Sequence, residues 1–88
     1  MTLHYSPNAK KRIQSLPPEV KKGVREALEN LKKDPYQGKP LQRELIGFWS
    51  LRFKKYRIIY KIFSFREIYI YSLGHRRDIY QDFSSRMQ

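Results

Sequence analysis

The hydrophobic positions of this chain repeat about every four residues in its first half and every two residues in its second half. The first pattern predicts an amphipathic helix that ends at Asp34-Pro35. Its apolar positions are Val20, Val24, Ala27, Leu28 and Leu31. A shorter helix is predicted before it, from Ser6-Pro7 to Pro17, because serine is a favoured N-cap and proline a favoured first helical residue. The two helices share an apolar side, so we expect a helical hairpin.

The second half of the chain has the pattern of β-strands. From Trp49 onward, apolar and polar residues alternate, which predicts three antiparallel strands. Tight turns are expected near Lys54-Lys55 and at residues 64–67. A short strand at residues 2–5 would come first. A short helix is predicted to close the chain, with the apolar residues Ile79, Phe83 and Met87.

This element order predicts an α+β fold in which an N-terminal strand and a two-helix hairpin pack on an antiparallel sheet (β-α-α-β-β-β), followed by a short C-terminal helix. Residues 1–88 are expected to form a single domain. The helices would cover one sheet face and leave the other to solvent or to a ligand. The alternation places on this second face Ser50, Arg52, Lys54, Arg57 and Lys61. In the segment between the helices and the strands, the side chains expected to pack in the core are Leu41, Leu45 and Ile46.

The charge balance narrows the classes of partner. Nineteen Lys and Arg residues against eight Asp and Glu leave a net charge of +11. Such a field attracts polyanions, so nucleic acid is the first candidate partner, an acidic protein the second and an anionic membrane surface the third. A general solubility charge is the competing interpretation, but residues 52–77 hold eight basic residues and one acid, Glu67. The chain has no cysteine, no signal-peptide pattern and no apolar run near the roughly 20 residues that span a bilayer, so a cytoplasmic protein is expected.

The end of the last predicted strand carries the most reactive groups. An alternating run of Ile and Tyr stops at Gly74, and His75, Arg76, Arg77 and Tyr80 follow in the loop. Loops at strand ends are where a rigid scaffold often presents its functional groups. Two guanidinium groups, an imidazole and a phenol suit a phosphodiester substrate and offer little to a metal. We therefore expect neither a metal site nor a cofactor.

Two motifs and the element order resemble the RelE/ParE superfamily of bacterial and archaeal toxins, and RelE-type toxins most closely. The motifs are LRFKKYRIIY at residues 51–60 and LGHRRDIY at residues 73–80. The resemblance implies the toxin of a type II toxin–antitoxin system, which enters the ribosomal A site and cuts mRNA without a metal. It also implies two partners, a cognate antitoxin that wraps the toxin and the mRNA held on the ribosome.

The resemblance also implies roles for individual residues. Arg57 matches the arginine of the family's Tyr-Arg pair, Arg76 the arginine of the final loop and Tyr80 the tyrosine beyond it. Arg52 matches a basic position on the preceding strand. The predicted catalytic set is therefore Arg52, Arg57, His75, Arg76 and Tyr80. Additional RNA contacts are expected from Lys54, Lys55, Lys61 and Arg77. Ser50 departs from the family pattern, since a second basic residue often stands there.

Metal-free RNA cleavage requires a base for the 2′-hydroxyl, stabilisation of the phosphorane and a proton for the leaving 5′-oxygen. Arginine suits the second task, since its planar guanidinium holds two phosphate oxygens at once, and Arg57 and Arg76 are the candidates. Two candidates remain for the base. Tyr80 follows from the family match and would need nearby arginines to favour its phenolate. His75 follows from intrinsic chemistry, because histidine titrates near neutral pH.

Other functions remain open at this point. A ParE-type inhibitor that binds DNA gyrase would have the same fold without catalysis. A plain RNA-binding module would bind with steep salt dependence and leave the message whole. The site residues also have structural interpretations: the strand arginines as solvated surface residues, Tyr80 as a packing residue and His75 as a hydrogen-bonded loop residue.

Overall fold

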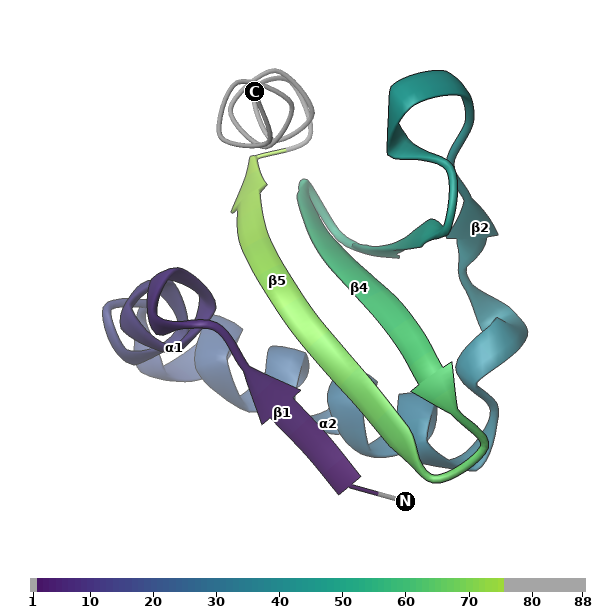
Figure 1. Cartoon of the computed structure of the whole chain (residues 1–88). Coiled ribbons are helices and arrows are strands. Elements are labelled where there is room, and N and C mark those ends of the chain that lie inside the picture. Colours follow the sequence, from purple (N-terminus) through teal and green to yellow (C-terminus); the bar gives the residue numbers. More distant parts are fainter. Residues whose placement is uncertain (1, 76–88) are drawn as a thin grey trace.

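The computed structural model describes residues 2–75, in which two helices pack on one face of a five-stranded sheet (Figure 1). The longer elements are β1 (Thr2–Tyr5), α1 (Pro7–Gln14), α2 (Pro18–Lys33), β3 (Phe48–Phe53), β4 (Tyr56–Ser64) and β5 (Glu67–His75). The connection between α2 and β3 contains the short elements η1 (Pro35–Gln37), β2 (Lys39–Pro40) and η2 (Arg43–Leu45). The predicted C-terminal helix lies outside the described residues. The predicted α+β architecture is confirmed.

The sheet is mixed, with the strand order β1-β5-β4-β3-β2. The neighbours from β5 to β2 are antiparallel, as expected, whereas β1 pairs with β5 in parallel. The predicted antiparallel arrangement of the three long strands is confirmed, and the structure adds the direction of β1. Parallel neighbours need a long crossover, and here the helices and the rest of the sheet supply it. The two-residue β2 was not predicted, because two residues are too few for alternation to be visible.

Local sequence explains where the helices begin and end. The Ser6 side chain accepts a hydrogen bond from the Ala9 N–H at 3.0 Å, so Ser6 is the predicted N-cap of α1. Its hydroxyl also donates to the Tyr71 carbonyl at 2.6 Å, which ties the start of α1 to β5. Helix α1 ends at Gln14, three residues before the predicted end at Pro17. Helix α2 ends at Lys33, because Asp34 precedes a proline and adopts an extended backbone.

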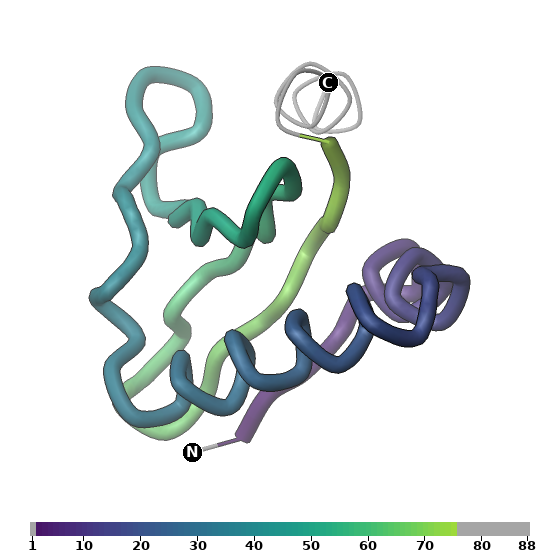
Figure 2. The backbone as a smooth tube through the Cα atoms, turned by 180° about the vertical axis from the view of Figure 1, so that it is seen from behind, coloured from purple at the N-terminus to yellow at the C-terminus, as the bar shows by residue number. Residues whose placement is uncertain are grey.

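The main core lies between the helices and the sheet. Seen from behind, α2 runs across the sheet on the face that Figure 1 turns away from the reader (Figure 2). The helices contribute Ala9, Val24, Leu28 and Leu31. Strands β4 and β5 contribute Ile58, Tyr60, Ile68, Ile70 and Leu73. Because successive residues of a strand point to opposite faces of the sheet, the core decides which side chains face away from the helices.

A smaller apolar cluster covers part of the second face. Phe48 and Ile59 are buried there beneath Leu41, Leu45 and Tyr71. The prediction that Leu41 and Leu45 pack inward is confirmed, although they join this cluster and not the main core. Ile46 is 75% exposed, so its predicted burial was wrong. The left-handed backbone of Arg43 and Gly47 (φ 57° and 96°) turns the loop around Ile46.

Ser50 is buried, although it lies on the second face of the sheet. It lies on the second face, opposite Ile59 in the sheet register, as the alternation predicted. It is nevertheless only 1% exposed, so the expectation of an open surface at this position was wrong. The second face is therefore closed to solvent at this position of β3.

Tyr60 links the main core to the loop after α2. Its side chain is fully buried, and its hydroxyl donates to the Pro35 carbonyl at 2.7 Å. Burial, above all, raises the pKa of the Tyr60 phenol to about 12. Gly38 makes room for this hydroxyl, since an added Cβ would meet the Tyr60 oxygen and approach the Ser50 carbonyl to 2.8 Å.

We expect Tyr60→Phe to remove a pH dependence of stability. The folded-state pKa of about 12 lies above the unfolded value of about 10, so the stabilisation is complete below pH 10 and is lost as the pH rises toward 12. The variant loses roughly 1 kcal/mol of unfolding free energy at neutral pH. Its unfolding free energy also falls less steeply between pH 10 and 12, which we call the alkaline limb of the stability curve. Urea unfolding across this range measures both effects.

The matched control is Tyr36→Phe, because the Tyr36 side chain is 63% exposed. This control should follow the wild-type alkaline limb. An identical limb in wild type and Tyr60→Phe would show that the buried phenol does not govern the loss of stability.

Candidate functional site

The β3–β4 hairpin brings two of the predicted catalytic arginines together. Arg52 and Arg57 are direct cross-strand partners on either side of the tight turn at Lys54, whose φ is 53°. Their neighbours along each strand, among them Leu51 and Ile58, belong to the helix-side core. Both arginines therefore lie on the second face, as predicted, and we call Arg52, Arg57 and Lys61 the site face cations.

This pairing places like charges opposite one another, which is unfavourable for the folded state. Neither arginine forms an ion pair within residues 2–75. The Arg52 Nε donates to the Lys54 carbonyl at 3.3 Å, which holds that guanidinium beside the turn. The Arg57 Nε is buried and has no hydrogen-bond acceptor in the described part of the chain. An anion placed here would neutralise the pair and supply the missing acceptor.

The neighbour of Arg57 on β5 is a buried glycine. Its Cα partner there is Gly74, which has no side chain to occupy the same face. On the other side, Arg52 is exposed to solvent. Arg52 is therefore open to solvent, whereas Arg57 is half-buried beside the buried backbone of Gly74.

Lys61 lies farther along β4 on the same face, opposite Phe48 and Tyr69. Its Nζ is 5.4 Å from the centroid of the Phe48 ring and 5.6 Å from that of Phe63. Lys54 is placed differently, because its Nζ lies 5.7 Å from the ring of Phe53, a helix-side residue. The structure therefore does not gather the Lys54 ammonium with the arginine pair. Lys55 is exposed in the turn.

His75 does not join the arginines. Strand β5 continues through Gly74 to His75, so the predicted end of the strand before Gly74 was wrong. His75 is the Cα partner of Tyr56, and the two rings are 5.2 Å apart. Since partners share a sheet face and Tyr56 packs against the main core, His75 lies on the side opposite Arg57.

The remaining predicted site residues, Arg76, Arg77 and Tyr80, lie outside the described residues and stay predictions. Within residues 2–75, His, Asp and Glu side chains form no group of three that could hold a metal ion. No helix in this part of the chain is long and apolar enough to cross a membrane. An open groove of about 570 Å³ lies beside β1, lined in part by Leu3, Ile13 and Leu28, and includes none of the predicted site residues.

A sequence profile described as the ParE toxin of type II toxin–antitoxin system, parDE, matches residues 3–80. The chain belongs to the ParE/RelE toxin family. This ParE/RelE chain is 36% identical over 83 residues to Toxin RelG of Mycobacterium tuberculosis, which covers 91% of this chain and 95% of that protein. It is thus a toxin of the type II toxin–antitoxin class, related to the RelE toxins.

Solved structures of ParE/RelE proteins share its fold. A chain of the M. tuberculosis RelBE2 toxin–antitoxin complex superimposes with a TM-score of 0.76 at 35% identity, covering 85% of this chain and 96% of that one. Isolated E. coli RelE superimposes with a TM-score of 0.71, covering 98% of this chain and 97% of that one. At 17% identity, this second likeness concerns the fold alone.

Sequence reasoning missed two features of this toxin's site. One is the burial of Ser50, for which the alternation gives no signal. The other is the side on which His75 lies, and here a signal existed. Counting the alternation from Leu73, a core residue, puts Gly74 on the site face and His75 on the helix side.

Replacing one arginine of the pair is expected to stabilise the fold. Arg57→Gln removes the like-charge opposition to Arg52, so the free energy of unfolding rises by roughly 0.2–1 kcal/mol, less at high salt. Chemical denaturation at low and high salt measures the change.

Lys61→Gln is the matched control, since it makes the same charge change on the same strand face. It removes cation–π contacts with two rings, so it lowers the unfolding free energy. Equal destabilisation by both variants would mean that Arg57 acts as a packing residue and the pair is not under repulsion.

Proposed function

We propose that this toxin is a ribosome-dependent, metal-independent endoribonuclease that cleaves mRNA in the ribosomal A site. The observation that supports this proposal best is the pair Arg52 and Arg57, adjacent on one sheet face and without ion-pair partners among the described residues. The unsatisfied Arg57 Nε adds a donor that a phosphate oxygen would satisfy. An RNA phosphate is an anion of the right charge and geometry for this pair.

The proposed reaction is an in-line attack within the RNA. A base takes the proton of the ribose 2′-hydroxyl, and the 2′-oxygen forms a bond to the adjacent phosphorus. Arg57 and Arg52 hold the non-bridging oxygens as negative charge increases on the phosphorane. The bond from phosphorus to the 5′-oxygen then breaks, and that oxygen takes up a proton. The products are a 2′,3′-cyclic phosphate and a 5′-hydroxyl end.

The same geometry supports a choice between the two candidate bases. His75 lies on the helix side of the sheet end and Arg57 on the other, which favours Tyr80 over His75. Arg76 is proposed to share the phosphate with Arg57, as the family resemblance implies. The described residues hold no ready base beside the arginine pair, so the ribosome is proposed to complete the geometry of mRNA and enzyme.

The proposal includes a protein partner and a compartment. The related M. tuberculosis RelBE2 and E. coli RelBE structures are toxin–antitoxin complexes. We infer that this toxin, too, is neutralised in the cytoplasm by a cognate antitoxin. The net charge of +11 favours an antitoxin segment that is acidic or amphipathic.

A second function has one observation in its favour. The matching family profile is described as the ParE toxin, and a ParE-type protein would inhibit DNA gyrase without cutting RNA. Cell extracts separate the two functions. Cut mRNA with 5′-hydroxyl ends supports the nuclease, whereas gyrase-trapped DNA breaks with intact mRNA support the inhibitor.

Removing Arg57 tests the nuclease directly. Arg57→Gln is expected to slow cleavage of mRNA on programmed ribosomes by about 100-fold or more, because a preorganised cation at the developing charge is lost. The control Arg25→Gln changes an exposed arginine of α2 and should cleave like the wild type. Wild-type rates for Arg57→Gln would remove the arginine pair from the mechanism.

The two candidate bases give opposite expectations. Tyr80→Phe is expected to impair cleavage more than His75→Ala, because His75 lies on the other side of the sheet from Arg57. Single-turnover cleavage on ribosomes, measured for both variants, ranks them. A larger loss in His75→Ala would transfer the role of base to the histidine.

A further inference from the structure

Two phenylalanine rings project from the end of the sheet that is distant from the arginine pair. Phe63 is 56% exposed and Phe65 is 76% exposed, on either side of Ser64 where β4 turns into β5. Large aromatic rings that face water together mark a surface for binding. Neither ring belongs to either apolar cluster of the fold.

The Phe63 ring is the outer end of a row of rings on the site face. It packs edge-on against Tyr69, with ring centroids 6.0 Å apart. Tyr69 contacts Tyr71 at 4.5 Å, and Tyr71 contacts the buried Phe48 at 5.1 Å. This row anchors the exposed ring in the second apolar cluster, so Phe63 is held in place and needs little ordering when a ligand binds.

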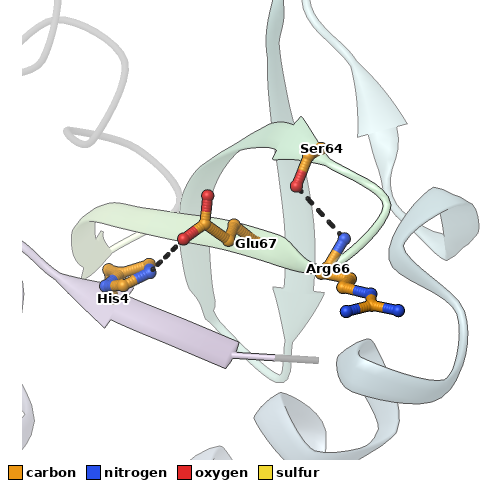
Figure 3. A network of polar contacts seen from close by, with 4 residues as sticks. All are labelled: His4, Ser64, Arg66 and Glu67. Carbon is orange, nitrogen blue, oxygen red and sulfur yellow. Dashed lines mark hydrogen bonds and ion pairs between the residues drawn. The ribbon is translucent and has the colours of Figure 1, made fainter.

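Cations lie over both exposed rings. The Lys61 Nζ is 5.6 Å from the Phe63 centroid, and the Arg66 Cζ is 5.0 Å from the Phe65 centroid. The acid of this turn, Glu67, is engaged elsewhere, since His4 Nε2 lies 3.4 Å from its carboxylate. Figure 3 shows the Glu67 carboxylate turned toward His4 and the Arg66 guanidinium directed away from it. The rings therefore lie in positive surroundings.

We propose that Phe63 and Phe65, with Lys61 and Arg66, form a second RNA contact, on which unpaired bases stack while the two cations meet the phosphates. This inference rests on the proposed function, because it takes RNA as the ligand. The second contact defines a path for the RNA strand along the second face of the sheet. Phe63 is six residues from Arg57 along β4, or about 20 Å at roughly 3.3 Å per residue, so the bases bound here lie several nucleotides from the scissile phosphate.

The chemistry of this surface favours RNA over a protein partner. An apolar protein face covering the rings would have to desolvate the Lys61 ammonium and the Arg66 guanidinium without pairing them. A nucleic acid strand supplies flat bases for the rings and phosphates for the cations together. Stacking on aromatic rings tolerates every base, so this contact adds affinity with little sequence preference.

The test compares two fluorescent probes of equal length and charge, an oligoadenylate of about twelve nucleotides and an abasic ribose-phosphate oligomer. Anisotropy titrations use the full chain carrying Arg57→Gln, so that neither probe is cut. The double variant Phe63→Ala/Phe65→Ala is expected to bind the oligoadenylate about 5-fold or more weakly and to bind the abasic oligomer unchanged. Tyr36→Ala, which removes an exposed ring on η1, is the control and should bind both probes like the parent chain.

Conservative variants separate stacking from simple apolar contact. Phe63→Trp/Phe65→Trp should keep or strengthen oligoadenylate binding, and Phe63→Leu/Phe65→Leu should weaken it as the alanines do, because leucine keeps apolar area but has no π-face. Undiminished binding by the leucine variant, or an equal loss of affinity for both probes in the alanine variant, would overturn the inference. Loss of antitoxin binding in the alanine variant alone, with RNA binding intact, would assign the surface to a protein.

This outcome is independent of the cleavage assay. Base-dependent binding by a chain that cuts no mRNA would uphold the stacking surface and reject the nuclease. If the chain cleaves mRNA and its oligoadenylate binding is unchanged by substitution of Phe63 and Phe65, the nuclease is upheld and the stacking surface is rejected.

Discussion

The packing of β4 against the helices is the interaction on which the rest of this structure depends. Ile58 and Tyr60 are buried in the main core, each at 1% exposure or less. A one-residue slip of β4 would exchange them for Arg57, Ile59 and Lys61. Burying an unpaired guanidinium is unfavourable by several kcal/mol, in addition to roughly 1.5–3 kcal/mol for each large apolar side chain moved into water. The core therefore sets the direction in which the arginine of the site points.

The same register opposes Arg52 and Arg57 in an arrangement that favours binding at the expense of stability. A cross-strand pair of like charges is a poor choice for a sheet with no ligand. It becomes favourable when a phosphate lies between the two groups, since each guanidinium then gains a charge-assisted hydrogen bond. A small domain with a modest core has a low free energy of unfolding. The proposed site is therefore limited to a few unpaired cations. Aromatic rings that stabilise the fold occupy the rest of this face.

The second face consists of two parts with different physical character. On the β3 side, Leu41 and Leu45 pack against the buried Phe48 and Ile59, and Ser50 is buried as well. Toward the β4–β5 turn, the row from Phe48 through Tyr71 and Tyr69 to Phe63 becomes steadily more accessible to solvent. Arg57 lies near one end of β4, and Phe63 lies near the other end on the same face. A flexible polyanion with flat bases matches both ends, which neither a compact anion nor an apolar peptide does.

Periodicity along the chain determined the helices, the three long strands and the face shared by Arg52, Arg57 and Lys61, because each follows from spacing between near neighbours. Family motifs added the roles proposed for Arg76 and Tyr80. Tertiary structure alone decided that β1 pairs with β5 in parallel, that Ser50 is buried and Ile46 exposed, and that β5 continues to His75 on the helix side. These features depend on contacts between segments distant along the chain and on the exact residue at which a strand ends. Local sequence propensity carries little information about long-range contacts or about the exact end of a strand.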